Sequence, residues 1–186
     1  MFYLFFNMHY EGENPDRAIE LVLRTAGQHF HVSRAYIYEA EQEDNQMVRL
    51  TYEWCAEGVP SRGEFLERFL IPKENVINSR EKDIYRCDDV HAFGGLADWM
   101  LPRMDQAGVR AFLHSSLLDA GSYRGCIGFD SCADSRIWSD EEQEILRQIT
   151  RTVGGYLLRT RAMERRSRQD PTTGLPSFSR FRRQVA

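Results

Sequence analysis

The sequence has few of the features that mark membrane, secreted or nucleic-acid-binding proteins. No stretch approaches the roughly 20 apolar residues of a membrane span. Met1 to Phe6 is apolar but too short for a secretion signal, and no small-residue cleavage site follows it. The net charge is only −4 with both signs interspersed, so no basic field indicates nucleic acid. We therefore expect a cytoplasmic protein with no membrane span in this chain and no nucleic-acid partner.

Cysteine is scarce and has no metal-binding pattern. The four residues, Cys55, Cys87, Cys126 and Cys132, form no C-x-x-C pair, and no histidine stands at a ligand-like spacing from a pair of them. We expect reduced thiols and no metal site.

Catalytic patterns are equally sparse. Gly94-Gly95 is an isolated pair, more typical of a turn than of a phosphate-binding loop. Ser115 and Ser116 lie beside His114, but no strand-to-helix elbow or third group supports a nucleophile and base. We expect no catalytic residues in this chain and no required cofactor.

The residues that are present predict one globular domain with an extension. The chain has 186 residues, of which 42% are hydrophobic and 12% aromatic, enough for a sizeable core. Helical and period-2 patterns alternate along it, which predicts an α+β fold. The clearest segments are a helix from Asn14-Pro15-Asp16 to Phe30, strands at Arg34–Glu39 and Met47–Cys55, a hairpin of Val109–Leu118 and Arg124–Asp130, and a helix over residues 139–168.

The middle of the chain predicts shorter elements. Phe65, Leu66, Phe69 and Leu70 form the apolar face of a short helix that ends at Pro72. Ile84 to Asp88 is a weak strand. A second helical face runs from Leu96 to Ala107 and ends with Gly108 at its C-terminus.

The order and spacing of several short motifs resemble the GAF family. They are Asp16-Arg-Ala-Ile19 with Leu23, Arg34-Ala-Tyr-Ile37, Tyr52-Glu-Trp-Cys55 before Gly58-Val59, Gly108-Val-Arg110, Gly125-Cys-Ile-Gly-Phe-Asp130 and Trp138-Ser-Asp-Glu-Glu142. The resemblance covers roughly residues 14–160. It implies a regulatory domain with a central antiparallel sheet, helices from both termini on one face and a small-molecule pocket on the other.

The C-terminal helix predicts a dimer and a link to another domain. Ser139 and Glu142 have the spacing of a capping box. After Leu158 the helix is charged almost all round, as expected of one that leaves the globule. Steps of three and four residues define a heptad seam, which predicts a parallel homodimer; its members are Leu146, Ile149, Val153, Tyr156, Thr160 and Met163.

The last residues resemble the start of a GGDEF domain, the diguanylate cyclase module. Asp170, Thr173, Gly174 and Leu175 match the family's D-x-L-T-G-L pattern, and Ser177 stands where the family has an Asn that helps to hold the guanine of GTP. The resemblance implies an output domain that makes cyclic di-GMP. The expected organisation is an N-terminal extension (1–13), a GAF-like sensory domain (14–160), a charged helical linker (161–169) and the truncated start of the GGDEF domain (170–186).

The expected function is sensory. A ligand or partner in the pocket would bias the dimer, and the C-terminal helix would report this to the GGDEF domain in cis. The alternative is a dimerisation scaffold whose pocket is filled by its own aromatic side chains. The candidate pocket residues are aromatics of the middle of the chain with their nearest polar groups: Tyr38, Trp54, Cys55, Phe69, Trp99, Phe112, His114 and Phe129. Composition does not identify the ligand.

Overall fold

The computed structural model describes residues 15–41, 46–73, 75 and 82–168. The predicted extension (1–13) and GGDEF-like segment (170–186) lie outside the described residues. A six-stranded sheet forms the middle layer, with every neighbouring pair antiparallel and the strands in the order β3-β2-β1-β6-β5-β4. The strands are β1 (Arg34–Ala40), β2 (Met47–Cys55), β3 (Arg68–Leu70), β4 (Ile84–Cys87), β5 (Ala111–Asp119) and β6 (Ser122–Ser131). This confirms the predicted α+β class.

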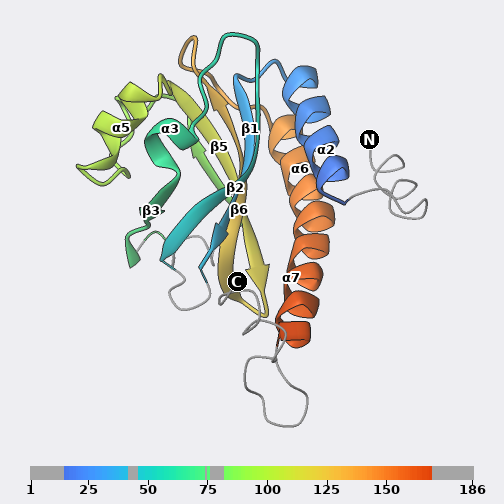
Figure 1. The fold of residues 1–186 in the computed structure, drawn as a ribbon. Helices are drawn as coiled ribbons and strands as arrows, with labels where there is room; N and C mark the ends of the chain where they lie inside the picture. Colours follow the sequence, from blue (N-terminus) through green and yellow to red (C-terminus); the bar gives the residue numbers. More distant parts are fainter. Residues whose placement is uncertain (1–14, 42–45, 74, 76–81, 169–186) are drawn as a thin grey trace, which may run out of the picture.

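Helices from both ends of the described chain cover one face of the sheet (Figure 1). They are α2 (Pro15–His29) and one continuous rod made of α6 (Asp140–Ile149), the π-helix η1 (Thr150–Gly154) and α7 (Gly155–Arg168). The main core lies between these helices and the sheet. It combines Leu23 of α2 and Ile149 of α6 with Ile37, Leu113 and Phe129 of the sheet, all of them fully buried. The predicted packing of terminal helices on one face is therefore confirmed.

Two short helices, α3 (Gly63–Leu66) and α5 (Met100–Gln106), lie over the opposite face of the sheet (Figure 1). We call these two helices the cap. A second apolar cluster joins them to the sheet through Leu66, Met104 and Phe112. Short elements suffice because each buries only one or two large side chains against the sheet.

Local sequence signals set several element boundaries as expected. The side chain of Ser139 accepts a hydrogen bond from the Glu142 amide, and the Glu142 carboxylate accepts one from the Ser139 amide, so the capping box is confirmed. Gly108 follows α5 with φ +70°, a conformation that glycine adopts without steric cost.

The predicted helix over Phe65–Leu70 is wrong beyond Leu66. Arg68–Leu70 forms β3, which pairs with Met47–Arg49 at one edge of the sheet. Because β2 offers unpaired backbone groups there, a short segment gains hydrogen bonds as a strand that outweigh its helical side-chain pattern.

The predicted intermolecular seam needs a correction as well. Leu146, Ile149 and Val153 are 0–2% exposed and pack in the domain's own core, so they are not available to a second chain. Heptad spacing describes a buried stripe on a single domain as well as a seam between two. Of the other three members, Tyr156 and Thr160 are half-buried and Met163 is 68% exposed.

In the part of the chain that the structure describes, no helix combines the length and apolar character that crossing a membrane requires.

The burial of Val153 yields the first prediction. Val153→Asp should lower the free energy of unfolding by more than about 3 kcal/mol, because it places a carboxylate in the core. Met163→Asp introduces the same charge into the same helix at an exposed position and should change stability by about 0.5 kcal/mol or less. Urea unfolding of both variants makes the comparison. Equal effects would contradict the assignment of Val153 to the core.

Candidate functional site

Strand register decides which side chains face the cap. Tyr36 of β1 and His114 of β5 both pair with Gly128 of β6, while Tyr38 and Ser116 both pair with Cys126. Directly paired residues project from the same face of a sheet. These side chains therefore project away from the terminal helices, into the layer beneath the cap.

A buried charge cluster occupies this layer. The Asp130 carboxylate contacts Arg62 at 2.5 Å and Arg34 at 3.3 Å, and all three side chains are at most 1% exposed. Tyr36 donates its hydroxyl proton to the other carboxylate oxygen at 2.7 Å. Burying charges costs several kcal/mol per ion unless each is paired and hydrogen-bonded, and here every charge has both kinds of partner.

The two arginines extend the cluster to the backbone of neighbouring segments. Arg34 donates to the carbonyl oxygens of Pro60 at 2.8 Å and Ala107 at 2.6 Å, which ties the residues before α3 and after α5 to the sheet. Arg62 lies over the Tyr36 ring, with its guanidinium carbon 4.7 Å from the ring centroid. Although burial disfavours the cation, Asp130 holds the pKa of Arg62 above its ordinary value.

His114 joins the cluster from β5. Its Nε2 lies 2.6 Å from the Tyr36 hydroxyl, and the Phe112 ring stacks on it with centroids 4.6 Å apart. The ring crosses directly over Gly128, where an added Cβ would lie 2.6 Å from the imidazole Cδ2. Burial and the nearby Arg62 charge lower the pKa of His114 from 6.5 to about 3, so the imidazole is neutral at physiological pH.

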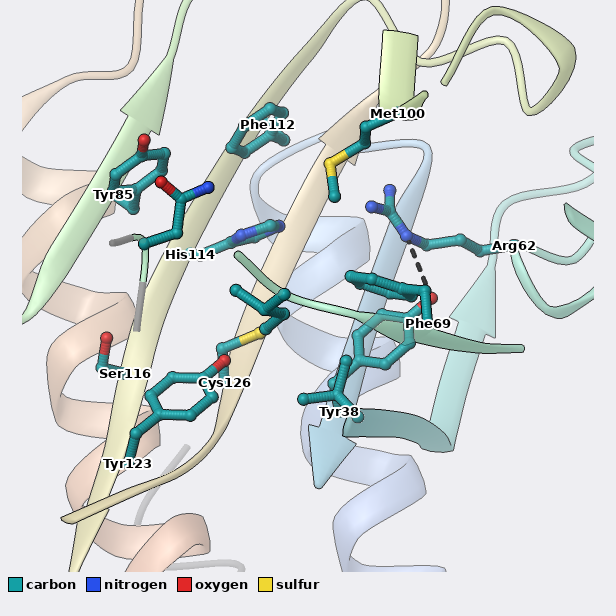
Figure 2. A pocket seen from close by; sticks show the side chains of 13 residues that line it. Tyr38, Arg62, Phe69, Tyr85, Met100, Phe112, His114, Ser116, Tyr123 and Cys126 are labelled. Atoms are coloured by element: carbon teal, nitrogen blue, oxygen red, sulfur yellow. Dashed lines mark hydrogen bonds between the residues drawn. The ribbon is translucent and has the colours of Figure 1, made fainter. Parts of the chain in front are cut away.

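A small cavity of about 70 Å³ opens beside this cluster, between the sheet and the cap. Figure 2 shows His114 near its centre, between Phe112 and Cys126, with Arg62 and Tyr38 across from it. The lining is mostly aromatic and apolar, with a few polar groups; its labelled members are Tyr38, Arg62, Phe69, Tyr85, Met100, Phe112, His114, Ser116, Tyr123 and Cys126.

Four of the eight predicted pocket residues line this cavity: Tyr38, Phe69, Phe112 and His114. The other four lie elsewhere. Phe129 is buried in the main core, and Trp54 packs against that core beside Gly27 of α2. Cys55 is half-buried at the end of β2, where burial raises the pKa of its thiol to about 11. Trp99 is 39% exposed at the start of α5, with its ring 6.0 Å from Phe69.

The charged part of the site is absent from the residues predicted from the sequence. Asp130 ends the apolar run Cys126-Ile-Gly-Phe, and Arg34 begins the apolar strand β1. A charge inside an apolar strand is a usable signal, because such a residue is rarely buried without a partner. Arg62 lies in a polar loop and carries no such signal.

The described part of the chain contains neither a group of side chains placed to bind a metal ion nor a disulfide. No group of three or more His, Cys, Asp or Glu side chains is placed there to bind a metal ion. All four cysteines are free thiols. Burial raises the pKa of Cys126, the thiol that lines the cavity, to about 11, so it stays protonated and unreactive at neutral pH.

Comparison with protein families agrees with this geometry. The GAF domain model matches residues 14–157, which is most of the chain and all of the sheet. The chain belongs to the GAF family. Among curated proteins, none matches the sequence.

Several solved GAF structures share the fold. The blue-light absorbing form of the PixJ GAF domain from Thermosynechococcus elongatus superposes with a TM-score of 0.65 at 19% identity, covering 80% of this chain and 88% of that one. A domain assigned to a two-component sensor histidine kinase of Sinorhizobium meliloti gives 0.65 at 15% identity, covering 82% and 97%. The chromophore-binding domain of the Stigmatella aurantiaca bacteriophytochrome gives 0.65 at 14% identity, covering 83% and 57%. At these identities the likeness shows the fold alone.

The neutral state of His114 yields a pH prediction. The unfolded chain takes up a proton at this position below about pH 6.5 and the folded chain only near pH 3. The stabilisation is therefore present above pH 6.5 and lost as the pH falls through this window, by up to about 1.4 kcal/mol per pH unit. His114→Phe should lack this loss, so the stability difference between wild type and variant should change across the window.

Urea unfolding at several pH values between 3.5 and 7.5, chosen to bracket most of that window, measures the difference. His91→Phe, at a histidine whose side chain is 48% exposed, controls for the loss of an imidazole. A constant difference between wild type and His114→Phe at all pH values would contradict a neutral, buried His114.

Proposed function

We propose that the chain is a sensory GAF domain whose cavity takes a small molecule and whose C-terminal helix controls a following GGDEF domain that makes cyclic di-GMP. The observation that carries the proposal is the double role of β5. His114 and Ser116 of this strand line the cavity, whereas Leu113 and Leu117 pack in the core beneath the terminal helices. One strand thus contacts both the candidate ligand site and the helix layer.

The contact on the helix side falls on the π-helix. Leu117 lies so close to Gly154 that a Cβ there would overlap its side chain. Thr150, the first residue of η1, has a buried hydroxyl oxygen with no hydrogen-bond partner among the described residues. π-Helical turns are rare and concentrate at functional sites, and an unpaired buried hydroxyl is costly. Both features are expected of a segment that has a second conformation of similar energy.

A change in η1 would be transmitted to α7. Converting the π turn to a regular α turn shifts the phase of the helix by about one residue, which rotates α7 by about 100° relative to α6. A ligand that displaces β5 by a fraction of an ångström would bias this choice, because packed elements switch between discrete arrangements. The motif at Asp170–Leu175, outside the described residues, supports a GGDEF domain as the receiver.

The proposal includes a homodimer, because two GGDEF active sites must meet around one product. With the first half of the predicted seam buried in the core, Tyr156, Thr160 and Met163 are the members that remain for a partner helix. Sedimentation of the chain as a monomer at high concentration would contradict this part.

The rival function is a scaffold that binds no ligand. The size of the cavity favours it, since pockets for drug-sized ligands measure about 300–1,000 Å³ and this one holds about 70 Å³. The rival predicts that no change at β5 or η1 alters the output domain.

Two neighbouring glycines allow a direct test of the helix contact. In the protein that carries this chain together with the proposed GGDEF domain, Gly154→Ala should change the rate of cyclic di-GMP formation from GTP by at least about five-fold, the scale of ordinary allosteric coupling. The added methyl group must displace Leu117. Gly155→Ala adds the same methyl group where the nearest atom, Nη1 of Arg159, is 3.4 Å away, and should leave the rate unchanged.

Residues 1–186 alone should form no cyclic di-GMP, because their sequence contains no G-G-D-E-F signature. A complete protein that makes no product, or equal rates for the two glycine variants, would contradict the proposal.

A further inference from the structure

The hydrogen bonds of the buried cluster determine which nitrogen of His114 carries the proton. A carboxylate only accepts hydrogen bonds, so the single hydroxyl proton of Tyr36 is used in its bond to Asp130. Burial raises the pKa of Tyr36 well above its ordinary value, so the hydroxyl keeps that proton. The 2.6 Å contact between the Tyr36 oxygen and Nε2 of His114 therefore needs its proton from the imidazole. His114 is protonated on Nε2, and its Nδ1 carries a lone pair.

The ring orientation places this lone pair on the cavity side. Cδ2 faces the backbone of Gly128 in the sheet, and Nε2 points to Tyr36. Nδ1 lies across the ring from Cδ2, so it points away from the sheet into the layer that the cavity occupies. Among the described residues, none donates a hydrogen bond to it. The cavity thus presents an acceptor that needs a donor.

Arg62 lines the same cavity but does not offer an equivalent site for anions. Its guanidinium donates to the Asp130 carboxylate at 2.5 Å and to the Tyr38 hydroxyl at 3.2 Å, with a further contact to the Met104 sulfur at 3.6 Å. The side chain is 1% exposed. An anion would have to compete with a carboxylate already in place and would meet the lone pair of His114.

We propose, building on the function proposed above, that the cavity selects uncharged ligands whose small end carries an N–H or O–H group that donates to Nδ1 of His114, and that it rejects carboxylates and phosphates. The rest of the wall is mostly apolar or aromatic, with Phe69, Met100 and Phe112 among its members, and suits a short hydrocarbon portion beside the donor. Its further polar groups include the Ser116 hydroxyl and the Asn75 amide, which carry no charge. One water needs about 10–15 Å³ of cavity volume of this kind. A cavity of about 70 Å³ therefore admits a ligand portion of roughly four or five non-hydrogen atoms.

Acetamide and acetate form a matched pair of probes. They have the same shape and number of non-hydrogen atoms, but only acetamide is uncharged and donates hydrogen bonds. Two-dimensional NMR of 15N-labelled protein follows both the backbone amides of β5 and the imidazole nitrogens of His114. Nδ1 should show the chemical shift of an unprotonated nitrogen, and that shift should move when acetamide is added at millimolar concentration. Acetate should move neither Nδ1 nor the β5 amides.

Two variants locate the interaction. His114→Phe keeps a ring against Phe112 but removes the acceptor, and it should weaken acetamide binding about ten-fold, as expected for one hydrogen bond. His91→Phe, on the exposed loop before α5, should bind acetamide as the wild type does. If His114→Phe is too unstable to study, Tyr36→Phe serves in its place, because loss of the Tyr36 hydroxyl removes the constraint on the tautomer and lets the proton move to Nδ1.

The proposal is overturned if Nδ1 carries the proton in the free protein, if acetate shifts the β5 resonances as strongly as acetamide, or if neither probe binds. None of these results bears on the glycine variants, whose effect on cyclic di-GMP formation tests the sensory function independently.

Discussion

The Asp130 carboxylate accepts hydrogen bonds from two buried guanidinium groups, and the segments that meet around it form the candidate site. Arg34 begins β1, Asp130 lies near the end of β6 and Arg62 directly precedes α3. Their side chains reach further, to the backbone after α5 and to the tyrosines of β1. Asp130 is the partner that the cluster requires most, since its removal leaves two buried cations without a counter-charge. An unpaired buried charge costs about 3–5 kcal/mol. The position of the cap over the sheet, and with it the shape of the cavity, depends on this cluster.

The polarity of the cavity is a consequence of the same arrangement. Arg62 lines the cavity, but its charge is already paired with Asp130, so it is not available to an anion. Tyr36 donates its proton to Asp130 and accepts one from His114, which fixes the tautomer of the imidazole. His114 is also part of β5, whose opposite face carries Leu117 against Gly154 of the π-helix. The proposed ligand contact and the proposed helix contact therefore belong to the same strand, β5. In a sheet that is covered on both faces, alternate residues of one strand contact different layers.

Sequence patterns predicted the architecture better than the site. Period-2 and helical patterns located β1, β2, β5, β6, α2 and the C-terminal rod, because each of these elements buries one continuous face. The sequence-based prediction places both Trp54 and Cys55 in the pocket, although consecutive strand residues face opposite sides of a sheet. The prediction also places both Phe112 and Phe129 in the pocket. The register pairs Phe129 with Leu113 and not with Phe112, so the two phenylalanines project from opposite faces of the sheet. Register depends on long-range pairing, and so does the meeting of Arg62 with Asp130 across 68 residues. The heptad of the C-terminal helix needs correction for a different reason: burial against the domain's own sheet and burial against a partner helix produce the same spacing, and Leu146, Ile149 and Val153 are buried in the first way.

Amide hydrogen exchange in Arg62→Met tests most directly whether the charge cluster holds the cap to the sheet. Methionine keeps much of the side-chain volume, and its introduction leaves Arg34 and Asp130 as a neutral buried pair. The amides of the cap, at Leu66 in α3 and around Met104 in α5, should lose protection, whereas those of α6 and of β1 should keep the protection that they have in the wild type. Unchanged exchange in the cap, or an equal loss of protection in α6, would contradict the account.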